Sequence, residues 1–215
     1  MRTFLFTFLF FSFMMISCNS DAQIYTIETN LGNIQVKLYD KTPLHKENFE
    51  KLVEAKFYDN VLFHRVIQGF MIQAGNPATK PAVDLDSLMA KLSYTIPAEF
   101  IPEYFHKKGA LAAARVGDAV NPEKRSSSSQ FYIVQGRTYA DIELDQIEKQ
   151  NNLEFSELQR GIYRAIGGTP FLDQNYTVFG EVVKGMDIVD AIASVPTGER
   201  DVPEKEIRIL RIVKD

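Results

Sequence analysis

The segment from Phe63 to Gly75 limits what this chain can fold into more than any other stretch of the sequence. Apolar residues lie on both sides of Gly69, and this pattern predicts two short strands joined at the glycine. One arginine, Arg65, lies among these apolar residues, and the segment contains no acidic residue to pair with it. We therefore expect a site in which this cation faces an apolar pocket and a ligand from outside the chain.

The remainder of the chain alternates between short strand patterns and a few helical ones. Ile34, Val36 and Leu38 alternate with Gln35, Lys37 and Tyr39, which is the period of a half-buried strand. A proline directly after Thr42 predicts a helix N-terminus with the threonine as its cap. Strands are predicted at residues 23–29, 33–39, 61–73, 109–116, 130–134, 177–183 and 206–213, and helices at 42–56, 84–92 and 186–193.

Residues 136–166 change to a helical pattern and form a predicted insertion, which Gly167 and Gly168 end as helix C-caps do. Its apolar stripe either packs on the rest of the fold, which we favour, or faces a partner. The stripe consists of Leu144, Ile147, Phe155, Leu158 and Ile162. Many short strands framed by two helices predict a mainly β architecture, an antiparallel barrel that is closed to remove its edges.

The N-terminal residues have the pattern of an export signal. Arg2 precedes a mostly apolar run, and we predict a signal peptide over residues 1–17. The run is shorter than the roughly 20 residues that a membrane-spanning helix needs. Met15 to Cys18 resembles the lipobox of bacterial lipoproteins, in which the cysteine is acylated, and Cys18 is the only cysteine. The alternative is an ordinary signal peptide cleaved nearby, which leaves a free thiol and a soluble periplasmic protein.

These features predict a lipoprotein of the bacterial cell envelope that faces the periplasm. An acyl group on Cys18 would hold the domain at a membrane surface without spanning the bilayer. Residues 18–22 would form a polar tether, and residues 23–215 would form one domain, long enough to bury a full core. With a single cysteine, the fold cannot rely on an internal disulfide.

Charge and composition argue against several other functions. The chain has 24 basic and 28 acidic side chains and shows no basic cluster of the kind that binds nucleic acid. The three histidines, His45, His64 and His106, lie far apart and outside any metal-ligand spacing, so we predict no metal and no cofactor. We interpret the serine run at 126–129 as a loop, because no acid–histidine set that would activate a serine is visible.

Four ordered stretches resemble the cyclophilin-type peptidyl-prolyl isomerases. They span nearly all of residues 23–213, apart from insertions, and lie at Phe63–Gly75, Gly109–Ala114, Ser129–Ile133 and Phe171–Val182. The resemblance implies a closed eight-stranded antiparallel barrel capped by two helices. It also implies catalysed rotation about the peptide bond before proline. We therefore expect a monomeric enzyme that acts on proline-containing polypeptides, in particular on exported proteins that are folding.

The resemblance also implies roles for individual side chains. Arg65 is the expected donor of a hydrogen bond to the prolyl nitrogen of the twisted amide. The pocket for the proline ring is expected to be walled by Phe70, Met71, Tyr132 and Leu172. Substrate backbone groups are expected to be held by Gln73, Gln130 and the main chain at Ala114 and Arg115, with Tyr176 at the rim.

Some positions depart from the family pattern or need a separate interpretation. Arg115 stands where asparagine is frequent, and Tyr132 adds a hydroxyl where phenylalanine is usual. Strand alternation places Phe131 on the opposite face from Gln130 and Tyr132, so we assign Phe131 to the core. We expect His64 to be a buried, hydrogen-bonded structural residue.

Two other functions are left open by the sequence. One is a non-catalytic module or chaperone of the same fold that holds proline-containing segments, which Arg115, Tyr132 and the insertion favour. The other is an unrelated ligand-carrying barrel, such as a lipocalin-like lipoprotein. The segment around Arg65 and the helix at 42–56 argue against that second reading.

Overall fold

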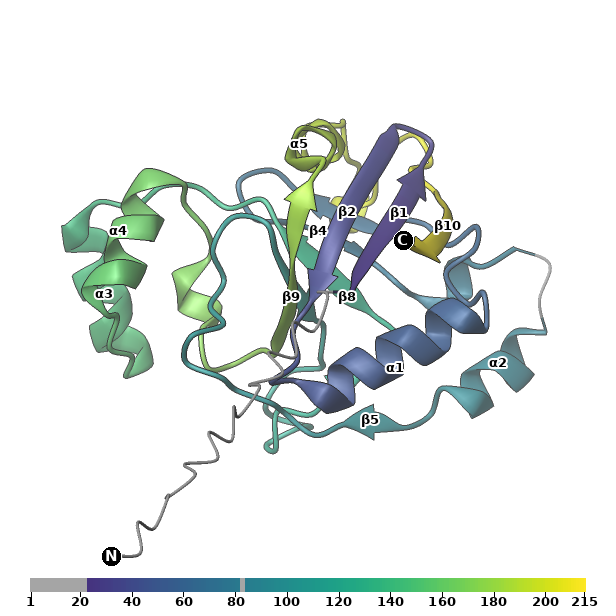
Figure 1. Ribbon diagram of the computed structural model, residues 1–215, viewed down its shortest axis with the longest axis horizontal. Coiled ribbons are helices and arrows are strands. Elements are labelled where there is room, and N and C mark those ends of the chain that lie inside the picture. The colour runs from purple at the N-terminus through teal and green to yellow at the C-terminus, as the bar shows by residue number, and fades with distance from the viewer. Residues whose placement is uncertain (1–22, 82–83) are drawn as a thin grey trace, which may run out of the picture.

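The computed structural model describes residues 23–81 and 84–215; the predicted signal peptide, the tether and Cys18 lie outside this part. Its main feature is one antiparallel sheet of eight strands in the order β10-β1-β2-β9-β6-β8-β4-β3 (Figure 1). Its strands are β1 (Ile24–Thr29), β2 (Gly32–Leu38), β3 (Arg65–Ile67), β4 (Met71–Ala74), β6 (Ala110–Ala113), β8 (Phe131–Val134), β9 (Val178–Lys184) and β10 (Ile209–Lys214). A second, small sheet pairs β5 (Thr95–Ile96) with β7 (Ser126–Ser127).

The eight-stranded sheet curls, but its two end strands do not pair with each other as a ladder. The chain before β3 meets the chain before β10 at one isolated bridge between Leu62 and Arg208. Phe63 N–H also donates to the carbonyl of Ile207 at 2.9 Å. Because β3 begins only after this bridge and has three residues, it is too short to extend the contact into a strand pair. The expectation of a fully closed barrel is therefore not confirmed.

Helices α1 (Pro43–Glu54) and α5 (Met186–Ala193) lie at opposite ends of the curled sheet, and α2 (Leu85–Lys91) lies beside α1 (Figure 1). Phe49 of α1 and Ile192 of α5 are buried in the main core that the sheet encloses. The predicted elements over these ranges are thus confirmed. Among the described residues, none of the helices has the length and apolar character that crossing a bilayer would need.

Helix α1 begins at the predicted residue but is capped differently. Thr42 makes no side-chain cap; its hydroxyl donates instead to the carbonyl of Tyr39. The carboxylate of Glu99 accepts the main-chain N–H groups of Leu44 and His45 at 3.1 and 3.0 Å. A negative charge is favourable at a helix N-terminus, so Glu99 takes over the role that the sequence assigned to the threonine.

The insertion forms two helices, α3 (Asp141–Asn151) and α4 (Glu157–Ala165), at one side of the sheet (Figure 1). Most of its apolar stripe packs into a small core of its own around Tyr163, together with Phe105 from the body of the fold. Leu158 was expected in this stripe, but it is 71% exposed. It stands on the outer face of a nine-residue helix that is otherwise polar there, so the three- and four-residue spacing overestimated the width of the buried face.

Candidate active site

Three strands place a row of polar side chains on one face of the sheet. Arg65 on β3 lies opposite Gln73 on β4, and Gln73 lies opposite Tyr132 on β8. Residues directly opposite each other point to the same face, and their neighbours along each strand point to the other. The neighbouring row is buried in the main core and consists of Val66, Ile72 and Ile133. Strand register therefore separates the polar face from the core.

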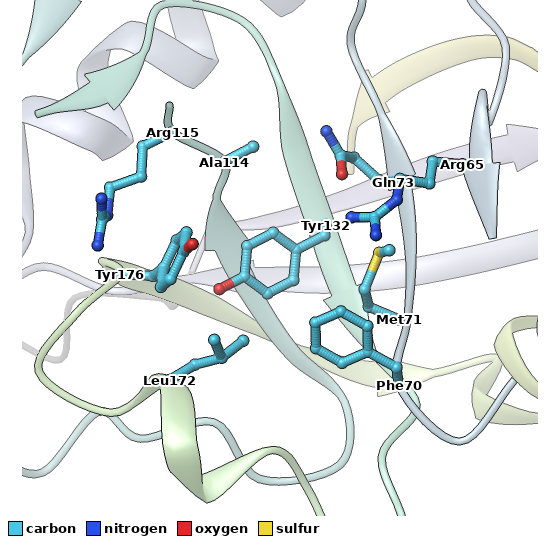
Figure 2. A pocket seen from close by; sticks show the side chains of 9 residues that line it. All are labelled: Arg65, Phe70, Met71, Gln73, Ala114, Arg115, Tyr132, Leu172 and Tyr176. Atoms are coloured by element: carbon cyan, nitrogen blue, oxygen red, sulfur yellow. The ribbon is translucent and has the colours of Figure 1, made fainter. Parts of the chain in front are cut away.

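The polar row borders a cavity of about 240 Å³. Figure 2 shows the side chains that line it, with the ring of Tyr132 near the middle. The lining contains every residue predicted to contact substrate except Gln130. Its members are Arg65, Phe70, Met71, Gln73, Ala114, Arg115, Tyr132, Leu172 and Tyr176. Phe131, by contrast, is buried in the main core, which confirms its assignment.

Gln130 does not line the cavity but is in contact with a residue that does. Gln73 Nε2 donates to Gln130 Oε1 at 3.1 Å, so the two amides hold each other. The main chain of Ala114 is also engaged within the protein. Its N–H donates to the carbonyl of Gln130 at 3.0 Å, and its carbonyl accepts from the N–H of Ser127 at 2.8 Å. Ala114 therefore has no spare N–H for a substrate, and only its carbonyl keeps a second lone pair.

Arg65 has an acidic partner, contrary to the expectation from the sequence. Its Nε donates to Asp201 Oδ2 at 3.1 Å, and each of the two side chains is 43% exposed. Asp201 belongs to a short 3₁₀ helix (Glu199–Asp201), more than a hundred residues along the chain. In the described ranges, 23–81 and 84–215, the terminal Nη atoms of Arg65 have no hydrogen-bond partner. The ion pair thus engages the Nε side of the guanidinium and leaves its outer edge, formed by the two Nη atoms, toward the cavity (Figure 2).

Arg115 lies on the opposite side of the cavity and is held by its own surroundings. Its Nε donates to the carbonyl of Asn175 at 2.8 Å, and Nη1 pairs with Asp118. The guanidinium carbon lies 4.5 Å from the ring centroid of Tyr176, within the range of a cation–π contact. Arg115 and Tyr176 therefore form one wall of the cavity, and Asp118 neutralises part of the charge of Arg115.

The hydroxyl that distinguishes Tyr132 from phenylalanine has a buried partner. His106 Nε2 lies 2.9 Å from the Tyr132 hydroxyl, and His106 Nδ1 lies 2.8 Å from Asp173 Oδ1. Burial is the main reason why the pKa of Tyr132 lies well above its usual value. The roles of His106 and Asp173 were not predicted from the sequence. The available signal was the tyrosine itself, because a buried phenol requires a hydrogen-bond partner.

His64 differs from its expected role. It is half-buried, and its Nδ1 is a buried atom without a hydrogen-bond partner in the described part of the chain. Burial lowers the pKa of this histidine, and the nearby charge of Arg65 adds to the effect. Both effects disfavour a positive charge on His64 beside Arg65.

A serine, a histidine and a carboxylate do meet in this structure, although the sequence showed no such set. His45 Nε2 lies 2.8 Å from Ser126 Oγ, and His45 Nδ1 lies 2.6 Å from Glu99 Oε2. Ser126 is only 1% exposed, so a substrate does not reach its hydroxyl. Burial lowers the pKa of His45 against the opposing effect of Glu99. We interpret this set as a clamp that ties the start of α1 to β7.

The chemistry that the cavity supports is binding and distortion of a peptide. The lining supplies the guanidinium edge of Arg65, the amide of Gln73, which Gln130 holds from outside the cavity, and apolar side chains; His106 contacts the cavity only through Tyr132. Among the described residues, no group of three or more histidine, cysteine, aspartate or glutamate side chains is arranged to hold a metal ion. Such a site suits a reaction in which no covalent bond breaks.

Comparison with known proteins agrees with this geometry. Residues 24–214 match the family model described as cyclophilin type peptidyl-prolyl cis-trans isomerase/CLD. A peptidyl-prolyl cis-trans isomerase of Acinetobacter baylyi is 34% identical over 193 residues, which cover 86% of this chain and 82% of that protein. The chain therefore belongs to the cyclophilin-type peptidyl-prolyl cis-trans isomerase family. This result excludes the lipocalin-like alternative.

Solved structures show the same fold. A crystal structure of a cyclophilin type peptidyl-prolyl cis-trans isomerase of Cryptosporidium parvum matches with a TM-score of 0.64 at 23% identity, over 90% of this chain and 98% of that chain. A second crystal structure of that protein, determined in the presence of the dipeptide Ala-Pro, matches with a TM-score of 0.63 over 90% of this chain and 99% of that chain.

Proposed function

We propose that this protein accelerates cis–trans isomerisation of X–Pro bonds in exported polypeptides and thereby assists their folding. The observation that carries the proposal is the outer edge of the Arg65 guanidinium beside an apolar cavity with the Tyr132 ring in its middle. The Cryptosporidium relative was crystallised in the presence of Ala-Pro. By analogy, proline-containing segments are the substrates of this chain, with the proline ring in the cavity.

The catalytic step needs only preferential binding of a twisted amide. Resonance imposes a barrier of about 18–20 kcal/mol on rotation about the peptide bond. Rotation makes the prolyl nitrogen pyramidal and a better hydrogen-bond acceptor, and the Nη atoms of Arg65 are placed to donate to it. A contact that exists only in the twisted state lowers the barrier, and it is stronger in an apolar site than in water.

The amide pair is suited to hold the substrate backbone on the proline's N-terminal side. Because Gln73 Nε2 donates to Gln130 Oε1, Gln73 keeps its Oε1 acceptor and Gln130 keeps its Nε2 donor. These are the complements of one peptide N–H and one peptide carbonyl. The pair therefore fixes the substrate chain while the prolyl bond rotates.

A proline-isomerisation assay tests this function directly. The purified protein is expected to accelerate isomerisation of an Ala-Pro peptide, and refolding of a protein limited by proline isomerisation, which otherwise takes tens to hundreds of seconds. A second function, a non-catalytic proline-binding or chaperone module, is favoured by the pairing of Arg65 with Asp201, which reduces its charge toward the cavity. Tight peptide binding without any acceleration would establish that module in place of the enzyme.

We further propose that the protein works as a monomer, tethered to the periplasmic face of the bacterial envelope by a lipid on Cys18. The support is the apolar N-terminal run that ends in Met15 to Cys18. In cells, the protein is expected in the membrane fraction, and Cys18→Ser is expected to move it to the soluble periplasmic fraction. An unacylated mature N-terminus by mass spectrometry would instead establish the soluble alternative.

A further inference from the structure

A buried chain of four polar side chains connects the insertion to the middle of the cavity. Tyr163 of α4 donates its hydroxyl to Asp173 Oδ2 at 2.6 Å, and Asp173 Oδ1 lies 2.8 Å from His106 Nδ1. His106 Nε2 then lies 2.9 Å from the hydroxyl of Tyr132. Their exposed fractions are 0% for Tyr163 and His106, 3% for Asp173 and 4% for Tyr132. The four groups therefore depend on each other for their hydrogen bonds.

The carboxylate of Asp173 sets the direction of every hydrogen bond in this chain. Both of its oxygens accept, since the main-chain N–H of His106 also donates to Oδ1 at 2.8 Å. Nδ1 of His106 faces this accepting oxygen and therefore donates to it, and in the neutral ring the lone pair of Nε2 then accepts from Tyr132. Burial raises the pKa of Tyr132 and of Tyr163 well above the usual value, so both phenols keep the proton that they donate. Tyr132 thus donates to His106 and His106 to Asp173, while Tyr163 donates to Asp173 from the other side.

We propose that His106, Asp173 and Tyr163 are positioning residues for Tyr132, so that the helical insertion sets the shape of the proline-binding cavity. The proposal rests on the function proposed above, in that the cavity takes the proline ring. None of the three residues lines the cavity itself. They act through the ring of Tyr132, which lies in the middle of the lining (Figure 2).

The extra hydroxyl explains why such positioning is needed. A phenylalanine ring at this place would need no partner, whereas a buried phenol without an acceptor is strongly disfavoured. If His106 were not held in place, the Tyr132 hydroxyl would have to turn toward water through the cavity. The ring would then tilt into the space that the proline ring occupies. Leu172, another part of the lining, directly precedes Asp173 and would move with it.

The insertion supports this chain at more than one point. Phe105, which precedes His106, packs edge-on against Tyr163 with ring centroids 5.5 Å apart. Both belong to the small core that the insertion builds. The carbonyl of His106 also accepts from the N–H of Thr169, just after the insertion, at 2.8 Å. The helices α3 and α4 thus hold the histidine through its neighbour and the aspartate through a direct hydrogen bond.

The test compares Tyr163→Phe with Tyr139→Phe. Both changes remove one phenol oxygen from the insertion core, but Tyr139 has no side-chain hydrogen bond in the described structure and Tyr163 has the bond to Asp173. We expect Tyr163→Phe to lower kcat/KM about tenfold, chiefly through a higher KM, as for loss of one hydrogen bond to a charged group. We expect Tyr139→Phe to match the unmodified protein. The melting temperature of each variant shows whether it is folded.

A double variant separates positioning from general destabilisation. If Tyr163 acts through the phenol of Tyr132, then adding Tyr163→Phe to Tyr132→Phe is expected to cause no further loss of kcat/KM. Equal losses in both backgrounds, or no loss in either, would overturn the proposal. Nitrogen NMR of the unmodified protein tests the assigned direction of the hydrogen bonds at His106. It is expected to show His106 protonated on Nδ1 alone, and a proton on Nε2 alone would overturn the assigned direction.

The same variants remain decisive if the protein turns out not to be an isomerase. The affinity for an Ala-Pro peptide, measured by chemical-shift titration, is then compared in place of kcat/KM. A lower affinity in Tyr163→Phe that disappears in the Tyr132→Phe background supports positioning even without catalysis. Failure of the isomerase assay alone therefore overturns the proposed function, whereas equal affinities in all backgrounds overturn the positioning role.

Discussion

Arg65→Ala is expected to lower kcat/KM for isomerisation of an Ala-Pro peptide by about 10²–10³-fold, the usual loss when one preorganised donor to a transition state is removed. Both Nη atoms of Arg65 lack a protein partner in the described structure, whereas Arg115 donates from Nε and Nη1 to groups of the protein. The change also leaves the core intact, because the side chain is 43% exposed. A peptide assay by exchange NMR, with the affinity measured in parallel, separates loss of catalysis from loss of binding.

Two matched variants show which property of Arg65 matters. Arg65→Lys keeps the charge but replaces the planar donor edge by a point charge, so we expect little recovery of activity. Asp201→Asn keeps the shape of the partner and removes the ion pair. Since both side chains are well exposed, we expect at most about a fivefold change from it. If Arg65→Ala retains more than about a tenth of the activity, the guanidinium is not the donor that stabilises the twisted amide.

The polar face of the sheet was predictable from the sequence because it depends on local alternation. Side chains in a strand alternate between two faces, so the assignment of Phe131 to the core and of Tyr132 to the site needed only their adjacency. The start of α1 at Pro43 and the hairpin of β1 and β2 likewise depend on neighbours in sequence. Resemblance to a family then supplied which face binds substrate.

The partners that hold the site were not predictable in this way. Asp201, Glu99 and Asp173 each meet their partners through loops or short 3₁₀ turns, at separations of 136, 54 and 67 residues. Periodicity carries no information about such distant polar contacts, and nothing near Arg65 in sequence pointed to Asp201. The predicted closure of the barrel was not confirmed for a related reason, because the length of strand β3 depends on contacts across the fold and not on its local sequence.

Gly168→Ala is expected to destabilise the fold by about 2–5 kcal/mol, from backbone strain together with overpacking. Gly168 has a φ of +157° and pairs with both Lys107 and Arg137, so it lies where the insertion rejoins the body of the fold. An added Cβ would lie 2.7 Å from Cε1 of Tyr163 and 2.9 Å from Cα of Lys107, and it would clash with the carbonyl oxygen of His106. Two of these neighbours are backbone atoms, which cannot turn away as a side chain does.

Thermal unfolding measures this loss, because about 2–4 °C of melting temperature corresponds to each kcal/mol in a domain of this size. We expect Gly168→Ala to melt about 5–15 °C lower, and Gly117→Ala, whose added Cβ meets no atom within 4 Å, to melt as the unmodified protein does. The atoms displaced at Gly168 belong to His106 and Tyr163, so the folded variant should also bind an Ala-Pro peptide less tightly. An unchanged melting temperature would mean that the insertion is free to move away from His106. The insertion could then not position Tyr132 through this histidine.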